Sequence, residues 1–319
     1  MGTYILRRLL WTVFLVLVVM VITFLLFNYL PTSDIAAIKA GRNATPESIA
    51  AIRSQLGLDD PLWKQFVNYV GDLFVHFDFG RSYGQNVEVK TLIFRALPNT
   101  LVLIVGAAVV WLASGIAVGI ISATRRGTFL DRFAMTSSLV LISAPVYFLG
   151  LVALYLFSSD LGLVKIFPPR GSYDVTDGLF KNLDAMILPW IVLASAFSAV
   201  YARLLRSNLL EVLSEDYIRT AKAKGLSPRR VVFRHGVRSA ITPIVTVFGL
   251  DIGILVGGAI LTESVFNIPG IGRLSYDAIQ RNDVPIVQGT TLFLSLAVML
   301  SILVVDVLYA FLDPRVRYN

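Results

Sequence analysis

The chain has 319 residues, of which 56% are hydrophobic and 15% charged, and its mean hydropathy is +0.73. A soluble domain carries about 45–50% apolar and about 25% charged residues, so the composition excludes a small secreted domain, a disordered chain and a coiled coil. Cysteine is absent and only two histidines occur, which excludes disulfides, a thiolate nucleophile and a Cys- or His-rich metal centre. In a soluble protein, the net charge of +7 would point to nucleic acid.

Six segments are apolar enough to cross a hydrocarbon core about 30 Å thick, which takes about 20 helical residues. The sequence therefore predicts an all-α integral membrane protein with six transmembrane helices. The first apolar run is longer than the core of a signal peptide, so we expect an uncleaved anchor. The predicted spans cover residues 9–30, 98–124, 133–158, 185–205, 241–262 and 290–312.

The basic residues divide unevenly between the two sides of the predicted membrane. Sixteen of the 28 Lys and Arg residues lie on the side that holds both termini, with five acidic residues. The other side has 12 basic and 14 acidic residues. Basic loops favour the cytoplasm, so we expect both termini inside. This topology accounts for the net charge and removes the reason to expect nucleic acid.

Three parts follow along the chain: an anchor helix at residues 1–30, an external insert at 31–97, and a five-helix core at 98–319 with a cytoplasmic loop at 207–240. The insert contains two predicted short amphipathic helices. The apolar face of the second one must be buried. It packs on the outer end of the bundle or lies in the membrane interface, or it helps to form a docking rim for an external partner. That face comprises Leu62, Phe66, Val70 and Leu73, flanked by Trp63, Val67 and Phe74.

Glycines spaced by four residues mark two predicted spans. Gly249, Gly253 and Gly257 share one face of the fifth span, and Gly115 and Gly119 repeat the pattern in the second. Such faces let a neighbouring helix approach closely. They indicate either ordinary packing within the chain or a central interface that moves during transport.

Two carboxylates lie inside predicted spans, and a proline interrupts each of the third and fourth spans. Asp251 is in mid-span beside the glycine face, where an ionisable side chain is a functional candidate by default. It lines a water-filled path or makes a polar contact between helices. For Asp306 we expect a structural contact with a basic cytoplasmic group. Pro145 and Pro189 remove backbone donors and allow kinks.

The loop after the fourth span has the pattern of two short helices separated by a glycine. Acidic residues begin the first helix and lysines end it, which suits the helix dipole. Gly225 can end this helix in the left-handed conformation, and Ser227 and Pro228 can begin the next one. Thr220 and Ala221 help to give the first helix a small-residue surface that a partner could approach. The alternatives are a solvated basic loop or a DNA-reading helix pair, and the second is disfavoured because both ends of the loop enter the membrane.

Residues 215–225 read Glu-Asp-Tyr-Ile-Arg-Thr-Ala-Lys-Ala-Lys-Gly. With this loop, the chain resembles permease subunits of the oligopeptide/dipeptide/nickel branch of bacterial ABC importers. The resemblance covers the whole chain, with further matching runs at residues 4–10, 97–101, 263–274 and 306–317. Arg-Thr-Ala stands where the family's Glu-Ala-Ala triplet would be, and the wider superfamily's Ile-x-Leu-Pro ending is missing. Both departures are typical of the peptide branch.

The resemblance implies the type I ABC importer permease architecture in a bacterial or archaeal cytoplasmic (inner) membrane, surrounded by lipid. It implies a second homologous permease subunit, two ATP-binding subunits that hold ATP and Mg, and an extracytoplasmic substrate-binding protein. This chain has no Gly-x-x-x-x-Gly-Lys-Ser/Thr phosphate loop, so we expect no cofactor, no metal and no catalytic residue in it. The resemblance assigns the ATPase-coupling role to Glu215, Asp216, Tyr217, Arg219, Thr220, Ala221, Lys224 and Gly225.

The implied function is ATP-driven import of di- or oligopeptides, with glutathione, nickel and oligosaccharides still open as solutes. Gly249, Asp251, Gly253 and Gly257 are the candidates for the translocation path or for helix packing. The main alternative is an ion-coupled secondary transporter with Asp251 as its carrier carboxylate. A membrane-embedded enzyme is a weaker alternative, because no nucleophile, base or metal-ligand set clusters in the sequence.

Overall fold

The computed structural model describes residues 2–29, 35–40, 44–55, 57–256 and 259–312. Within these residues the chain is helical apart from loops and two isolated β-bridges, Arg81–Glu88 and Ser158–Phe167. The chain forms two compact units, one made of Met1–Leu97 with Ile271–Asn319 and the other of Pro98–Gly270.

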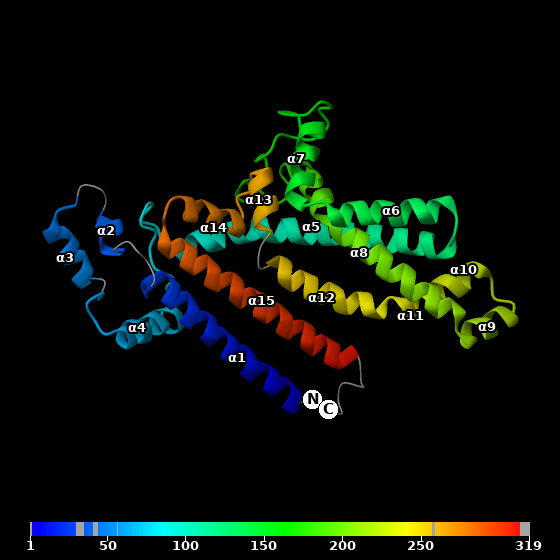
Figure 1. The fold of residues 1–319 in the computed structure, drawn as a ribbon, viewed down its shortest axis with the longest axis horizontal. Helices are drawn as coiled ribbons and strands as arrows, with labels where there is room; N and C mark the ends of the chain where they lie inside the picture. The colour runs from blue at the N-terminus through cyan, green and yellow to red at the C-terminus, as the bar shows by residue number, and fades with distance from the viewer. Residues whose placement is uncertain (1, 30–34, 41–43, 56, 257–258, 313–319) are drawn as a thin grey trace. The chain divides into compact units, whose positions relative to one another are not determined.

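In the first unit, α1 and α15 lie side by side (Figure 1). The core between them and α14 contains the buried side chains of Met20, Ile93 and Ile271. The helices of this unit are α1 (Gly2–Phe24), η1 (Leu25–Tyr29), α2 (Ile35–Ala40), α3 (Pro46–Gln55), α4 (Leu62–Val75), the beginning of α5 (Val89–Thr124), α14 (Ile271–Gln280) and α15 (Val284–Leu312).

The turn between α14 and α15 holds the loop that precedes α5. The buried carboxylate of Asp283 accepts hydrogen bonds from the Ser82 hydroxyl at 2.5 Å and from the backbone N–H groups of Tyr83 and Gly84 at 3.1 Å each. Burial, together with the nearby Asp283 carboxylate, raises the pKa of the Tyr83 phenol to about 12. The phenol therefore stays neutral to a higher pH than that of an exposed tyrosine.

In the second unit, α6 runs beside α8 (Figure 1). The core is centred on Trp111 of α5, whose ring stacks on Phe197 of α8 at a centroid distance of 4.9 Å. The helices are the rest of α5, α6 (Phe129–Ser143), α7 (Val146–Phe157), η2 (Val175–Asp177), η3 (Leu183–Met186), α8 (Ile187–Ser214), α9 (Asp216–Ala223), α10 (Pro228–Arg230), η4 (Val231–Val237), α11 (Arg238–Ala240), α12 (Thr242–Val256) and α13 (Ile260–Phe266).

Four helical stretches in the described residues are long and apolar enough to span a membrane, and two further pairs of helices would each make one bent span. The predicted six-span, all-α class is therefore consistent with the structure if both bent pairs cross. The straight stretches are Leu6–Phe27, Val89–Thr124, Leu183–Ser214 and Val284–Val305.

The third predicted span, residues 133–158, is broken near Pro145, where the sequence indicated that a kink was possible. It breaks between α6 and α7 with a bend of 106° (Figure 1). Ala144 is extended there, with ψ of 129°, because the ring of the following Pro145 disfavours a helical conformation. Pro189 lies in the first turn of α8, where proline is tolerated without a kink.

The fifth predicted span also differs from the structure. Its helix, α12, ends at Val256, and Thr262 belongs to the separate helix α13. On the other side, α12 follows the helical stretch Pro228–Ala240 after a bend of 43°. Gly257 and the side chain of Asp306 lie outside the part of the chain that the structure describes.

Candidate functional site

The loop between α8 and α12 contains the predicted first helix and glycine turn, whereas the second helix differs from the prediction. Helix α10 covers only Pro228–Arg230, Ser227 makes no side-chain cap, and the chain continues as the π-helix η4. After Ser214 the chain turns at Glu215 and forms α9, which has Asp216 in its first turn and Lys222 in its last. Gly225 follows with φ of +76°, a conformation that glycine adopts without steric cost. Ser227 then precedes α10, with Pro228 in its first turn. The glycine therefore sets the angle between two short helices.

One face of α9 is buried and the other is open. Ile218 and Ala221 pack with Val231 of η4, and Leu213 and Leu226 cover this small cluster. The interpretation of Ala221 as part of a partner-facing surface is therefore wrong, because its side chain points into the loop's own core. The two buried residues are three positions apart in the sequence, which puts them on the same face of a helix. Their shared face could therefore have been recognised from the sequence.

The remaining predicted residues of α9 lie on its open side. The side chains of Asp216 and Arg219 form an exposed ion pair at 3.2 Å, and Thr220 and Lys224 are exposed. Tyr217 is half-exposed, and its hydroxyl donates to Ser239 Oγ of α11 at 3.1 Å. The loop thus offers a polar, mixed-charge surface, backed by a small apolar core.

The structure brings Asp251 of α12 to Tyr201 of α8. The fully buried Tyr201 hydroxyl donates to Asp251 Oδ2 at 2.7 Å. Trp111 packs against the Tyr201 ring at a centroid distance of 6.3 Å. Of the glycine face on the same helix, Gly253 is buried and Gly249 half-buried. This arrangement fits the polar contact between helices that the sequence left open for Asp251.

Gly115 and Gly119 of α5 pack tightly against α8. A Cβ atom at Gly115 would lie 2.8 Å from Tyr201 Cβ, and one at Gly119 would lie 2.9 Å from Leu205 Cβ. Real side chains do not approach so closely, so these glycines let the two backbones meet. Their role in this structure is packing within the chain.

Sequence reasoning missed an ion pair that anchors α8, because it counted Asp131 and Arg206 only as loop charges. Arg206 donates through Nε to Asp131 Oδ1 at 2.7 Å and through Nη2 to Oδ2 at 2.9 Å. The Ser122 hydroxyl and the Gly127 N–H also donate to this carboxylate. The sequence did contain a signal for this ion pair. Asp131 lies just before the third predicted span and Arg206 just after the fourth, and the two side chains carry opposite charges.

A second missed carboxylate is Glu263 of α13, which is completely buried. Thr100 Oγ1 donates to Glu263 Oε1 at 2.7 Å. Asn99 donates to the Pro269 carbonyl in the loop after α13 at 3.2 Å, and it accepts from the N–H of Val175 in η2 at 2.8 Å. The run at residues 263–274 that the sequence analysis singled out is thus held to the beginning of the second predicted span by buried polar contacts.

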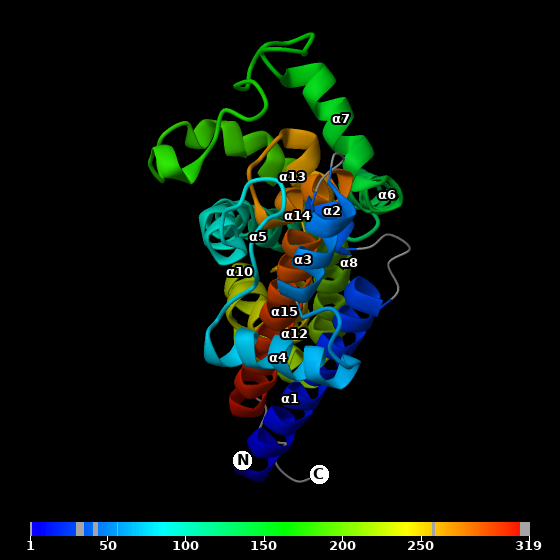
Figure 2. The same cartoon turned by 90° about the vertical axis from the view of Figure 1, so that its left-hand side faces the viewer.

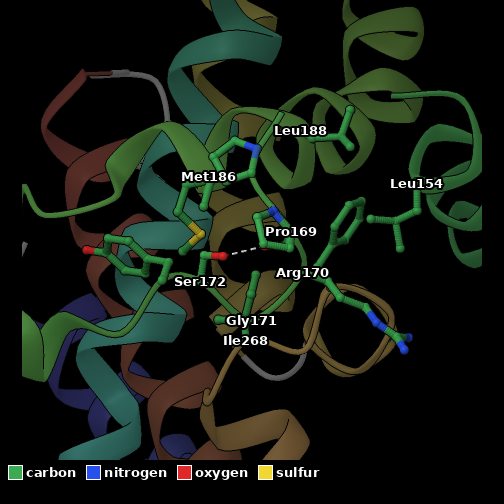
Figure 3. A pocket seen from close by; sticks show the side chains of 12 residues that line it. Leu154, Pro169, Arg170, Gly171, Ser172, Met186, Leu188 and Ile268 are labelled. Carbon is green, nitrogen blue, oxygen red and sulfur yellow. Dashed lines mark hydrogen bonds between the residues drawn. The ribbon is translucent and has the colours of Figure 1, made fainter. Parts of the chain in front are cut away.

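A small pocket lies beneath the loop that joins α7 to η3 (Figure 3). Leu154, Arg170, Met186 and Ile268 are among the residues that line it, and Ser172 bonds across it to the Pro169 carbonyl at 2.7 Å. Its volume of about 10 Å³ is roughly that of one water molecule. This pocket therefore cannot hold a transported solute.

Comparison with known proteins identifies the family. Residues 115–318 match the model of the "Binding-protein-dependent transport system inner membrane component", and residues 1–104 match the model of the N-terminal part of such components. The chain therefore belongs to this family of multi-pass inner-membrane transport proteins. It is the membrane permease subunit of an ABC transporter, in which separate ATPase subunits hydrolyse ATP, so the resemblance found in the sequence is confirmed.

Three relatives are similar to this chain over nearly all of its length. A probable peptide ABC transporter permease of Sinorhizobium fredii is 40% identical over 318 residues, covering 100% of both chains. A di/tripeptide transport system permease of Pseudomonas aeruginosa is 39% identical, with 94% of each chain covered. A glutathione transport system permease of Salmonella typhimurium is 41% identical, with 100% of each covered. The comparisons give the ion-coupled alternative no support.

Proposed function

We propose that this chain forms half of the translocation pathway of an ATP-driven importer for di- and oligopeptides. The observation that carries the proposal is the end-to-end similarity to relatives that are named for peptides, for di- and tripeptides and for glutathione, itself a tripeptide. Its partners are a second homologous permease subunit, two ATP-binding subunits that hold ATP and Mg, and an extracytoplasmic substrate-binding protein.

In this proposal both termini and the loop between α8 and α12 are cytoplasmic, and the exposed side of α9 docks on an ATP-binding subunit. The excess of basic residues on that side supports the orientation. Two features support the docking: α9 follows α8 after a single extended residue, Glu215, and its open face is polar. A displacement of α9 would therefore act on α8 directly.

Uptake by the reconstituted complex tests this function. The chain is purified with its partner subunits, placed in vesicles with the substrate-binding protein outside, and supplied with radiolabelled peptides. We expect accumulation that needs ATP inside the vesicles and survives a protonophore. Uptake that ignores ATP and collapses with the proton gradient would contradict the proposal. Uptake of nickel or an oligosaccharide in place of peptides would overturn the assignment of the solute.

A further inference from the structure

Helix α4 carries more apolar surface than the first unit buries. One strip, containing Phe66 and Tyr69, packs on α1, where the Phe24 ring lies 5.3 Å from the Phe66 ring and 5.8 Å from the Tyr69 ring. Leu73 on the same strip is buried. This contact accounts for one side of the helix.

A second apolar strip runs beside the first, and none of the residues that the structure describes covers it. Trp63, Val67 and Phe74 are 69%, 59% and 58% exposed. Residues at spacings of four and seven lie on one line along a helix, so the three side chains form a continuous ridge. Lys64 and Asn68 lie about 100° around α4 from Trp63 and Val67, on a line that continues to Val75, which is 77% exposed. The helix thus has a packed side, an exposed apolar ridge, and a third side that is polar as far as Asn68.

The position of α4 along α1 decides what meets this ridge. Helix α4 crosses α1 (Figure 2) and contacts it at Phe24, the last residue of α1. It touches Phe24, three residues before the end of the candidate span at Phe27, which is about 4.5 Å along the axis at 1.5 Å per residue. At this level Val21 of α1 and Leu25 of η1 are 40% and 41% exposed. On a membrane span, such exposed apolar side chains face lipid.

We propose that α4 is an interfacial helix that binds the lipid surface at the outer end of α1. Trp63, Val67 and Phe74 enter the boundary between head groups and acyl chains, and Lys64 and Asn68 stay in water. Tryptophan favours this boundary, because its ring is apolar and its N–H is polar. The lipid contact continues the lipid-facing surface of α1, and it fixes how the external insert sits over the span.

Fluorescence quenching at single cysteines tests the proposal, because the chain has no cysteine of its own. Val67→Cys and its neighbour Asn68→Cys, both exposed and so harmless to folding, are labelled with an environment-sensitive fluorophore in the assembled complex. The complex is reconstituted in phosphatidylcholine vesicles, and the signal from a parallel sample with the unsubstituted chain is subtracted. The quenchers are aqueous iodide and a lipid with a nitroxide near the head of its acyl chain.

We expect a blue-shifted emission at position 67, with several-fold stronger quenching by the nitroxide lipid and several-fold weaker quenching by iodide than at position 68. Trp63→Cys and Phe74→Cys should behave like Val67→Cys. Equal iodide quenching at positions 67 and 68 would overturn the proposal, because the ridge would then lie in water. Protection of position 67 from both quenchers would also overturn it, because a protein would then cover the ridge.

Discussion

Arg206 of α8 and Asp131 of α6 form a two-pronged ion pair, with N–O distances of 2.7 and 2.9 Å. The Asp131 side chain is 5% exposed and the Arg206 side chain 25%. The pair joins the beginning of α6 to α8 eight residues before α8 ends at Ser214. Within the second unit, the pair therefore ties α6 to the helix that leads into the loop at residues 215–230.

Breaking this pair should destabilise the subunit. Asp131→Asn leaves the guanidinium without its counter-charge, at a cost of about 3 kcal/mol for a largely buried pair. The melting temperature of the purified complex should fall, and the reversed pair Asp131→Arg with Arg206→Asp should recover part of the loss. Arg203→Gln, an exposed position on the same helix, is the control. Equal melting temperatures for Asp131→Asn and the control would show that the pair contributes nothing.

Gly225 should tolerate asparagine but not valine. A side chain at this position meets no atom within 4 Å, so only the positive φ is at issue. A β-branched residue there costs about 1–3 kcal/mol, whereas asparagine adopts this conformation readily. Gly225→Val should lose transport and the stimulation of ATP hydrolysis by loaded substrate-binding protein, whereas Gly225→Asn should keep both. If Gly225→Val transports normally, this turn plays no part in coupling.

Ala221 and Ala223 of α9 should respond differently to glutamate. Ala221 is buried beside Ile218 and Val231, so Ala221→Glu puts a charge into an apolar cluster and should loosen the loop. Ala223→Glu places the same charge on the open surface and should leave the loop folded. Hydrogen exchange of residues 215–230 measures this directly. Similar exchange rates in both variants would contradict the two-sided description of α9.

Gly115 should not accept even a methyl group without cost. The added Cβ would lie 2.8 Å from Tyr201 Cβ and 3.1 Å from the Ser198 carbonyl oxygen, so α5 and α8 must separate. We expect Gly115→Ala to cost about 1–3 kcal/mol. Gly71→Ala in α4, where no atom lies within 4 Å, should be neutral or slightly stabilising. The measurement is thermal unfolding of the two variants, and a loss that is equal in both would exclude close packing as the cause.

The carboxylate of Asp251 should be dispensable for energy coupling. An asparagine there still accepts a hydrogen bond from Tyr201, so Asp251→Asn should retain ATP-dependent uptake. Tyr201→Phe removes this hydrogen bond and should cost about 1 kcal/mol of stability. Loss of uptake in an Asp251→Asn complex that still assembles would revive the ion-coupled alternative.

The parts of the structure that local signals determine could be predicted from the sequence. The loop at residues 215–230 follows from charge placement, one glycine and a Ser-Pro pair, and each of these acts within a few residues. The number of apolar segments follows from composition. The break at Pro145 was predictable as a kink, but its 106° bend was not, because packing sets the direction of the next helix.

Contacts between distant residues could not be predicted in the same way. The pairing of Tyr201 with Asp251 joins positions 50 apart, and that of Thr100 with Glu263 joins positions 163 apart. Each depends on which helices become neighbours, and residue spacing alone does not specify this. The buried orientation of Ala221 was within reach, since its spacing from Ile218 is helical, but a small residue fits a core and a contact surface equally well.

The central claim is that the open face of α9 docks on an ATP-binding subunit. Cross-linking from this helix tests the claim most directly. Thr220→Cys lies on the exposed side and Ile218→Cys on the buried side of the same helix turn. In the assembled complex, a short photoactivatable cross-linker on residue 220 should capture the ATP-binding subunit, and the same group on residue 218 should not. An intact complex in which residue 220 captures no ATP-binding subunit would contradict the account.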